Sequence, residues 1–336
     1  MSRGTLAPAS LCYPRAVPSP ARPRDLLPPF PLDITTSRRR TFTALLGTLA
    51  LGFGCAHCGA RSSLAPPESG AGGSAPQPTT TVTTSYEPPP DAGAWTPKSL
   101  AGLVLWLDGT TGVHTSGGAV TSWDDQSGLA NDAAPDAPGS GDPVLAADAI
   151  GGVPAVRFDG SSYLVIEDDD SLQLGTGDFL VAVVARHTTP IDIGWGYGIF
   201  FIKYELPVPF TGPALVANTE AGGTQIIAQL AYQQAFITSA GGGLDDGRPL
   251  SMVMRRRVSA GTASLELRLN GANSAMSASS GFAVDLSAPG RPLFVGGTPD
   301  MQNIVGDIAE VITVKGATPD ADVAALEGYL GAKYGL

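Results

Sequence analysis

The chain has 336 residues, of which 43 are glycine, 29 are proline and only 15% are charged. This composition argues against a helical bundle and favours many short strands joined by turns. Beyond Cys55 the chain carries 13 Lys and Arg against 29 Asp and Glu, which argues against nucleic acid as a partner because phosphate contacts need clustered positive charge.

Residues 1–37 form a segment rich in proline and arginine without apolar periodicity. A signal peptide normally begins within a few residues of its charges, so we expect residues 1–37 to be a disordered extension upstream of the true start. Residues 38–55 predict a signal peptide, in which three arginines precede the apolar run TFTALLGTLALGFG. Because RRTF at 39–42 also resembles a twin-arginine export signal, the Sec and twin-arginine routes both stay open.

Cys55 ends this segment in the sequence GFGC, which resembles the lipobox of bacterial lipoproteins. The resemblance implies that Cys55 becomes a lipidated N-terminus and that the protein contacts a membrane only through this anchor. Ala56 after the anchor resembles the pattern of lipoproteins sent to the outer membrane. Gly52 and Phe53 depart from the usual Leu and small residue, and ordinary cleavage near Ala60 is the alternative.

Residues 56–97 predict a disordered tether, because a segment rich in Pro, Gly, Ser and Thr cannot bury enough apolar surface to offset the entropy of ordering. Such a tether would hold a following domain clear of a membrane surface. Cys58 forms a C-x-x-C with Cys55, but a redox or metal site there would lack partner ligands. No cysteine follows Cys58, so the domain beyond it has no disulfide.

Residues 98–336 consist of short apolar or alternating runs separated by Gly, Pro, Asn and Asp, a pattern that predicts strands and turns in one domain. In SLELRLNG the three leucines point inward and Asn270-Gly271 forms a tight turn. Eleven segments are predicted as strands: 103–108, 119–123, 153–160, 162–167, 179–187, 197–205, 224–239, 249–258, 264–271, 292–297 and 304–315.

One helix is predicted at the C-terminus, in TPDADVAALEGYLGAKYGL. Thr318 is expected as the N-cap and Pro319 as the first helical residue, and Gly335 ends the helix. Apolar residues at i, i+3 and i+7 from Val323 give the helix one face for docking. Strands without helical segments between them predict an all-β fold, a two-sheet antiparallel jelly-roll sandwich with a C-terminal helix.

Five motifs occur in an order that resembles a known family: LVLWLDG, SWDDQSG, VPAVRFDGSSYL, GDIAEVITV and ALEGYLGAKYGL. This order resembles that of bacterial laminin-G-like, concanavalin A-like jelly-roll domains and covers about residues 100–336, although 188–247 has no recognisable counterpart. The resemblance implies a two-sheet jelly roll and, for the class, glycan binding or adhesion.

The loop SWDDQSG is a candidate metal site or a well-satisfied turn. Asp124, Asp125 and Ser127 offer the oxygen ligands that calcium prefers, and Asp159 in FDG could converge on them, which makes calcium a candidate cofactor. Alternatively, the same side chains cap their own backbone while Trp123 points into the core. The structural role is the favoured interpretation.

Trp195 and Tyr197 lie among glycines in IDIGWGYGIFF and predict a platform for stacking on a sugar ring. The alternative is that both aromatic side chains belong to the core of the domain.

The sequence contains no catalytic motif of the jelly-roll glycoside hydrolases, which carry E-x-D-x-x-E on a strand. Asp307 and Glu310 are the nearest carboxylate pair, but residues three apart on a strand point to opposite faces unless a bulge intervenes. The basic run at 255–257 also lies on a predicted strand, where a solvated charged face is favoured over an anion-binding patch.

The sequence therefore favours a noncatalytic domain that binds a carbohydrate or a surface protein and is tethered to the cell envelope. A polysaccharide hydrolase or lyase with an unrecognised site is one alternative. A structural envelope component without a small ligand is the other.

Overall fold

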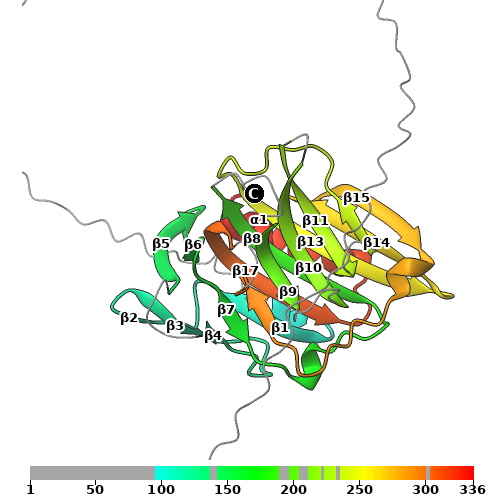
Figure 1. Cartoon of the computed structure of the whole chain (residues 1–336), viewed down its shortest axis with the longest axis horizontal. Helices are drawn as coiled ribbons and strands as arrows, with labels where there is room; N and C mark the ends of the chain where they lie inside the picture. The colour runs from blue at the N-terminus through cyan, green and yellow to red at the C-terminus, as the bar shows by residue number, and fades with distance from the viewer. Residues whose placement is uncertain are drawn as a thin grey trace, which may run out of the picture. The chain divides into compact units, whose positions relative to one another are not determined.

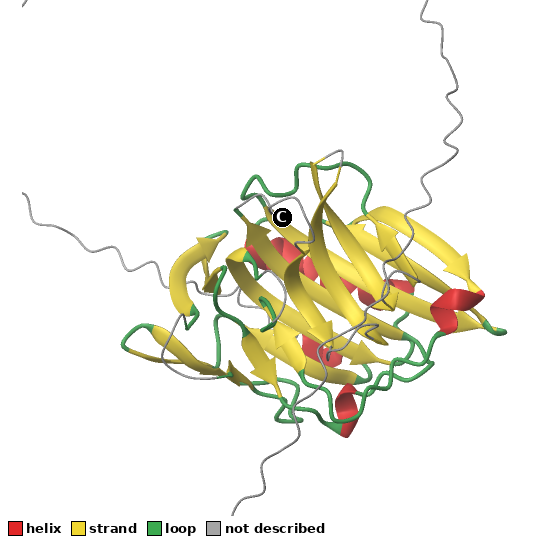
Figure 2. Ribbon diagram, in the orientation of Figure 1, coloured by secondary structure: helices red, strands yellow, loops and turns green. Residues whose placement is uncertain are grey.

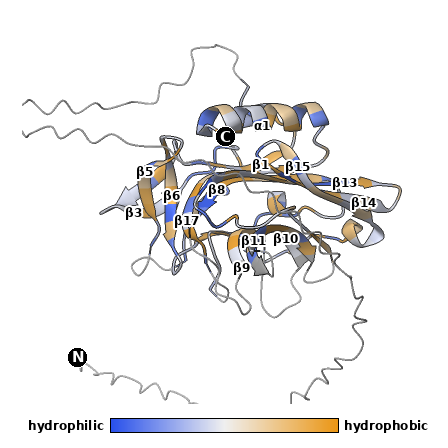
Figure 3. Cartoon of the chain, turned by 90° about the horizontal axis from the view of Figure 1, so that it is seen from above, coloured by the Kyte–Doolittle hydropathy of each residue, from blue (hydrophilic) through white to orange (hydrophobic). Residues whose placement is uncertain are grey.

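Three layers form the described part of the chain: two β-sheets and a C-terminal helix on the outer face of one of them (Figures 1 and 3). The computed structural model describes residues 95–136, 142–188, 197–203, 211–220, 223–231, 235–299 and 303–336. Figure 2 shows strands throughout both sheets. The predicted all-β sandwich with a C-terminal helix is confirmed.

The sheet beneath the helix, called the helix-side sheet, contains the two longest strands, of 11 residues each. Its strands pair antiparallel in the following spatial order: β1 (Leu103–Asp108), β17 (Val305–Lys315), β8 (Phe179–His187), β13 (Pro249–Ser259), β14 (Thr262–Leu269) and β15 (Ala272–Ser279). The first strand of the domain thus lies beside the last.

The second sheet, called the far sheet, is also antiparallel. Its spatial order is β4 (Ala133–Pro135), β7 (Leu164–Ile166), β16 (Leu293–Val295), β9 (Tyr197–Lys203), β10 (Thr211–Glu220), β11 (Gly223–Ala231) and β12 (Ala235–Thr238). Four further strands join the two sheets along one side: β2 (Val113–Ser116), β3 (Ala119–Trp123), β5 (Val144–Ile150) and β6 (Val153–Asp159). Short 3-10 helices occupy Pro97–Ser99, Asp170–Leu172 and Ser280–Ala283.

Strand β8 is buried on both faces, which explains why its sequence is continuously apolar rather than alternating. Phe179 and Val181 face the core between the sheets, whereas Leu180 and Ala182 face a second core beneath the helix. A strand covered on both faces has no solvated side and needs no polar residues. Strand β14 shows the alternating pattern instead, with Leu265 and Leu267 fully buried between the sheets as predicted.

Helix α1 (Asp320–Tyr334) buries Val323, Leu326 and Leu330 against the helix-side sheet, as its spacing predicts. Gly335 ends the helix in the left-handed conformation, with φ of 69°, and its N–H donates to the Gly331 carbonyl. The predicted N-cap at Thr318 is wrong. Pro319 takes the N-cap position because its backbone is still extended, with ψ of 154°, so the helix starts one residue later.

The predicted strands occur, and the structure adds several that the sequence pattern did not reveal. The predicted segment 224–239 is two strands, β11 and β12, rather than one. Strands β2, β4, β5, β10 and β15 were not predicted. Strand β10 contains Gly and Pro, and β15 reads ANSAMSAS with mostly exposed side chains, so neither carries a clear burial pattern. The Asn270-Gly271 turn is confirmed by positive φ at both residues.

Within the described residues, no helix has the length and apolar character needed to cross a membrane.

Candidate functional site

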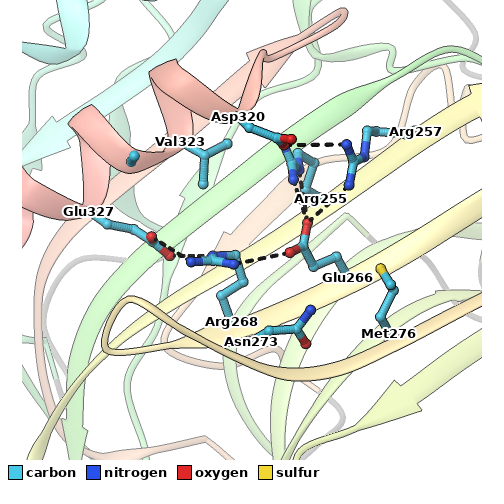
Figure 4. A pocket seen from close by; sticks show the side chains of 10 residues that line it. Arg255, Arg257, Glu266, Arg268, Asn273, Met276, Asp320, Val323 and Glu327 are labelled. Carbon is cyan, nitrogen blue, oxygen red and sulfur yellow. Dashed lines mark hydrogen bonds and ion pairs between the residues drawn. The ribbon is translucent and has the colours of Figure 1, made fainter.

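A groove with a volume of about 280 Å³ lies between the start of α1 and the outer face of β13, β14 and β15 (Figure 4). We call it the helix–sheet groove. Strand residues form its floor and the first turns of the helix form its wall. The floor comprises Arg255, Arg257, Glu266, Arg268, Asn273 and Met276, and the wall comprises Asp320, Val323, Ala324 and Glu327.

Guanidinium groups and carboxylates alternate along the floor and wall, as the dashed lines of Figure 4 trace. Arg268 Nε lies 2.6 Å from Glu327 Oε1, and Arg268 Nη1 lies 3.2 Å from Glu266 Oε1. Arg255 Nη2 lies 2.6 Å from Glu266 Oε2, and Arg255 Nη1 lies 2.7 Å from Asp320 Oδ1. Each of these carboxylates therefore has at least one arginine partner, and the pairs fix the helix to the sheet.

The pKa values in the groove follow from these contacts. Burial alone would raise the pKa of Glu266, but hydrogen bonds and charges from Arg255 and Arg268 outweigh it, and the pKa is lowered. The hydrogen bond from Arg255 is the largest cause of the lowered pKa of Asp320. The hydrogen bond to Glu327 is the largest cause of the raised pKa of Arg268. All these groups keep their charges at neutral pH.

Five groove side chains are exposed: Asp320, at 74%, and Ala324 on the helix, and Arg257, Asn273 and Met276 on the sheet. Arg257 is 45% exposed, and its Nη1 and Nη2 lie 3.3 Å from Asp320 and 3.9 Å from Glu266, respectively. Asn273 is exposed opposite Arg268 on β15, and Met276 is 59% exposed opposite Glu266. The groove therefore presents an amide, a guanidinium and an apolar side chain above a floor of paired charges.

Arg256 corrects the expectation that the basic run at 255–257 forms a solvated face. Its side chain is fully buried on the face of β13 opposite the groove. It donates hydrogen bonds to the carbonyls of Gly175, Gly177 and Val284, and its guanidinium lies 5.1 Å from the ring centre of Phe179. Burial lowers the pKa of Arg256 to about 10, so it remains charged at neutral pH. Arg256 therefore joins two loops rather than binding an anion.

Asp307 and Glu310 lie on the same face of β17. A register shift between Ile308 and Glu310 against β8 makes Ala309 an extra residue, which is the bulge that the sequence left open. Asp307 accepts hydrogen bonds from Arg157, at 2.8 Å, and from Arg186. Both carboxylates are 1% exposed.

Glu310 lies beneath α1 in a polar cluster. Its Oε1 accepts hydrogen bonds from Trp106 Nε1 at 2.7 Å and Tyr329 Oη at 3.0 Å. Its Oε2 accepts from Lys333 Nζ at 3.0 Å and Tyr334 Oη at 2.8 Å. Burial raises the pKa of Glu310, although Lys333 and Tyr334 act in the opposite direction. Asp307 and Glu310 thus serve internal contacts and do not form an open carboxylate pair.

The SWDDQSG loop pairs with the free edge of β1. Asp125 Oδ1 accepts hydrogen bonds from the backbone N–H of Trp106 at 2.8 Å and of Ser127 at 2.9 Å. Its Oδ2 accepts from Ser127 Oγ at 2.6 Å and from Asn131 N at 3.1 Å. The Gln126 N–H returns a bond to the Trp106 carbonyl at 2.7 Å. These bonds satisfy backbone groups that an edge strand would otherwise expose.

The expected convergence of Asp124, Asp125 and Asp159 on one ion is not found. Asp124 contacts His114, at 2.8 Å, and Asp159 accepts bonds from Ser161 and Ser162 in its own turn. Among the residues that the structure describes, no three His, Cys, Asp or Glu side chains are placed to hold a metal ion. The structural role of Asp125 explains this result, because four protein donors already occupy its oxygens. Trp123 is fully buried, as predicted, and donates to the Asp108 carbonyl at 2.9 Å.

The remaining predicted sites fall mostly outside the described residues. Trp195 lies outside them, as does Cys55 with the whole segment 1–94. Tyr197 is the first residue of β9, and the described residues do not include its side chain. The sugar platform and the lipid anchor therefore stay predictions.

Sequence reasoning missed the helix–sheet groove. Arg268, Asn273 and Glu327 belong to two strands and a helix, and no local motif links them. The one available signal was in β14, where Glu266 and Arg268 alternate with buried leucines. Both charged side chains therefore lie on the outward face, where they need partners of opposite charge.

Comparison with known structures supports the fold. No protein-family model matches the sequence, and the search of curated proteins gives no match. The binding domain of Paraclostridial Mosquitocidal Protein 1 aligns with a TM-score of 0.50 and 14% identity, over 70% of this chain and 53% of that one. The chain therefore spans about half the length of that toxin domain. The likeness shows a shared β-sandwich fold.

Two further solved structures align less well. Domain 4 of AbnA, an extracellular arabinanase of Geobacillus stearothermophilus solved with arabinotriose, has a TM-score of 0.49 and 14% identity, over 67% of this chain and 98% of that one. The binding domain of botulinum neurotoxin serotype D has a TM-score of 0.48 and 9% identity, over 68% and 52%.

Proposed function

We propose that this protein is a noncatalytic binding domain, held at the cell envelope, whose helix–sheet groove takes a neutral carbohydrate. The observation that carries the proposal is the alternation of charged groups along the groove. Three arginines face three carboxylates there, so the lining has no formal net charge. An anionic or cationic ligand gains no net attraction from such a surface.

Sugar hydroxyls suit this lining because each hydroxyl both donates and accepts a hydrogen bond. Arg257 and Asn273 supply accessible donors, Asn273 also supplies an acceptor, and Met276 supplies apolar contact for the C–H face of a ring. The volume of about 280 Å³ is at the small end of ligand pockets, which favours one or two sugar units over a long chain.

The absence of catalysis in the proposal is supported by Asp307 and Glu310, whose carboxylates are buried and bonded to other side chains of the protein. A glycosidase needs two carboxylates flanking the scissile bond. Asp307 is paired with two arginines and Glu310 lies beneath the helix. A polysaccharide hydrolase or lyase would have to use other residues, and release of reducing ends or unsaturated products from labelled polysaccharides would reveal it.

We further propose that the domain is exported and anchored through a lipid on Cys55, with residues 56–97 as a tether. Metabolic labelling with an alkyne palmitate analogue, followed by a click reaction, should label the wild type and not Cys55→Ala. Equal labelling of both proteins would place the lipid on another residue, and an unlabelled wild type would favour cleavage near Ala60.

A glycan array with the purified protein tests the carbohydrate proposal, followed by calorimetric titration of the best ligand. We expect Arg257→Ala and Asn273→Ala each to weaken binding at least tenfold. The control is Arg248→Ala, because Arg248 is similarly exposed, at 50% against 45% for Arg257, and forms a surface pair with Asp246. Binding that is unchanged in the groove variants would exclude the groove as the site. A blank array together with a cross-linked protein neighbour would favour protein binding or a structural envelope role.

A further inference from the structure

Lys333 lies between two carboxylates beneath the last turn of α1. Its Nζ is 2.8 Å from Asp108 Oδ2 and 3.0 Å from Glu310 Oε2. The same nitrogen donates to Tyr329 Oη at 2.9 Å. The ammonium group therefore has three partners inside the protein, through hydrogen bonds to Glu310 and Tyr329 and an ion pair with Asp108.

The three charged groups are almost completely removed from solvent. The side chains of Lys333, Asp108 and Glu310 are 7%, 9% and 1% exposed. Two carboxylates facing one ammonium group would leave a net negative charge in this site. Uncompensated buried charge is costly, and this cost raises the pKa of Glu310. The other titratable groups facing the site, Tyr329 and Tyr334, are neutral phenols, and burial raises the pKa of Tyr334 further.

The fold holds these groups in fixed positions. Asp108 ends β1 and lies directly opposite Glu310 on β17. Lys333 is held above them because α1 packs on the sheet through Val323, Leu326 and Leu330. Such positioning of an amine against a carboxyl group makes a condensation effectively unimolecular.

We propose that Lys333 and Asp108 condense into an intramolecular amide bond, with Glu310 as the group that transfers protons between them. The bond would join the last helix of the domain to its first strand. It goes beyond the binding function and does not depend on it.

The reaction balances without any co-reactant. Nζ of Lys333 attacks Cγ of Asp108, a C–N bond forms, and the Cγ–Oδ2 bond breaks. One of the three protons of the ammonium group stays on the amide nitrogen, and two leave with Oδ2 as water. Glu310 accepts each departing proton from Nζ and delivers it to the leaving oxygen, a task suited to a carboxyl group whose pKa is raised by burial. The positive and negative charges of the pair disappear together, so the product no longer buries an ion pair.

Mass spectrometry of the denatured, purified full chain tests the proposal. We expect an intact mass one water lower than the mass calculated for the purified chain from its observed N-terminus. Trypsin should release Ser99–Arg157 joined to Gly316–Leu336, with no cleavage after Lys333, because these peptides contain the two partners and no other internal lysine or arginine. Lys333→Met and Glu310→Gln should show the unreduced mass, whereas Lys315→Met, which alters an exposed lysine, should still lose one water.

A far-ultraviolet spectrum and a cooperative melt show whether each variant folds. The wild-type mass decides the question even where a variant does not fold. A wild-type chain that keeps its full mass after prolonged incubation in the folded state, with the two peptides recovered separately, would overturn the proposal and leave an ion pair. If folded Glu310→Gln still forms the amide bond, Glu310 is not the group that transfers the protons.

Discussion

Asp307 and Glu310 lie three residues apart on β17, yet both side chains project from the same face of the helix-side sheet. Ala309 between them is an extra residue that has no partner on β8, which pairs Ala185 with Ile308 and Val184 with Glu310. Ile308 and Val311 both reach the core between the sheets. A single inserted residue thus lets two carboxylates share one side while the apolar pattern on the other side continues.

Deletion of Ala309 should leave both carboxylates on the helix side of the sheet. Without the extra residue, Ile308 and Glu310 become neighbours opposite consecutive residues of β8, so the alternation of faces continues without a bulge. The loss in the free energy of unfolding should be limited to about 2 kcal/mol, from the buried Ala309 side chain and the hydrogen bond that its carbonyl accepts from the Gly109 N–H. Urea denaturation measures the loss, with deletion of Gly242 in the loop before β13 as the control. A loss above about 4 kcal/mol, as expected for a buried unpaired charge, would show that one carboxylate has turned into the core.

Glu310 should make the stability depend on pH in the direction opposite to most carboxylates. Its pKa is raised in the folded state above the ordinary value of 4.5, so the folded protein binds this proton more tightly than the unfolded chain. The stabilisation is complete below the ordinary pKa and is lost as the pH rises through the raised one. The comparison uses Lys333→Met and Lys333→Met/Glu310→Gln, because neither can form the proposed amide bond. The advantage of Lys333→Met in the free energy of unfolding should fall as the pH rises from 4. A constant difference across this range would contradict the raised pKa.

Arg256→Lys should cost far more stability than Arg257→Lys. Arg256 is buried and uses its planar donors on carbonyls of two loops, which a lysine cannot reproduce. Arg257 is 45% exposed and forms surface pairs. In chemical denaturation, we expect Arg256→Lys to lower the free energy of unfolding by about 3 kcal/mol and Arg257→Lys to lower it by under about 0.5 kcal/mol. Similar midpoints for the two variants would mean that the carbonyl contacts contribute little.

Asp125→Ala should destabilise the domain, and Asp124→Ala should not. Asp125 accepts four hydrogen bonds and covers the edge of β1. We therefore expect Asp125→Ala to lower the free energy of unfolding by roughly 3 kcal/mol. Asp124 forms an exposed contact with His114, at 42% and 59% exposure, and its loss should stay within about 0.5 kcal/mol. Thermal melts with and without calcium should coincide for the wild type and both variants. A wild-type melting temperature that rises with calcium, with no such rise in Asp125→Ala, would show that the loop binds calcium.

The sequence predicted those parts of the fold that depend on local periodicity. The alternation in β14 and the apolar spacing of α1 each follow from one burial pattern. Strand β10 escaped prediction because Gly212 and Pro213 read as breakers, although Gly212 is needed where the Lys203 carbonyl comes too close for a side chain. The N-cap was wrong by one residue because Thr318 and Pro319 both suit helix starts, and only the backbone geometry separates them.

The candidate sites were harder to predict because they depend on contacts between distant segments. Arg268 pairs with Glu327, which lies 59 residues further along the chain. Lys333 meets Asp108 only because β1 and β17 are neighbours. The residue types in SWDDQSG suit a metal and a turn equally well, and the difference lies in the backbone groups of Trp106 that Asp125 serves. No spacing within the loop encodes that partner.

The pairing of β1 with β17 also has a consequence for how the chain folds. Trp106 donates a hydrogen bond to Glu310 across 204 residues, so the helix-side sheet cannot be completed until β17 has been synthesised. Folding rates fall as contacts become more distant in sequence. We therefore expect slow folding of this domain, in which β1 stays exposed until β17 is available and depends on chaperones to avoid aggregation.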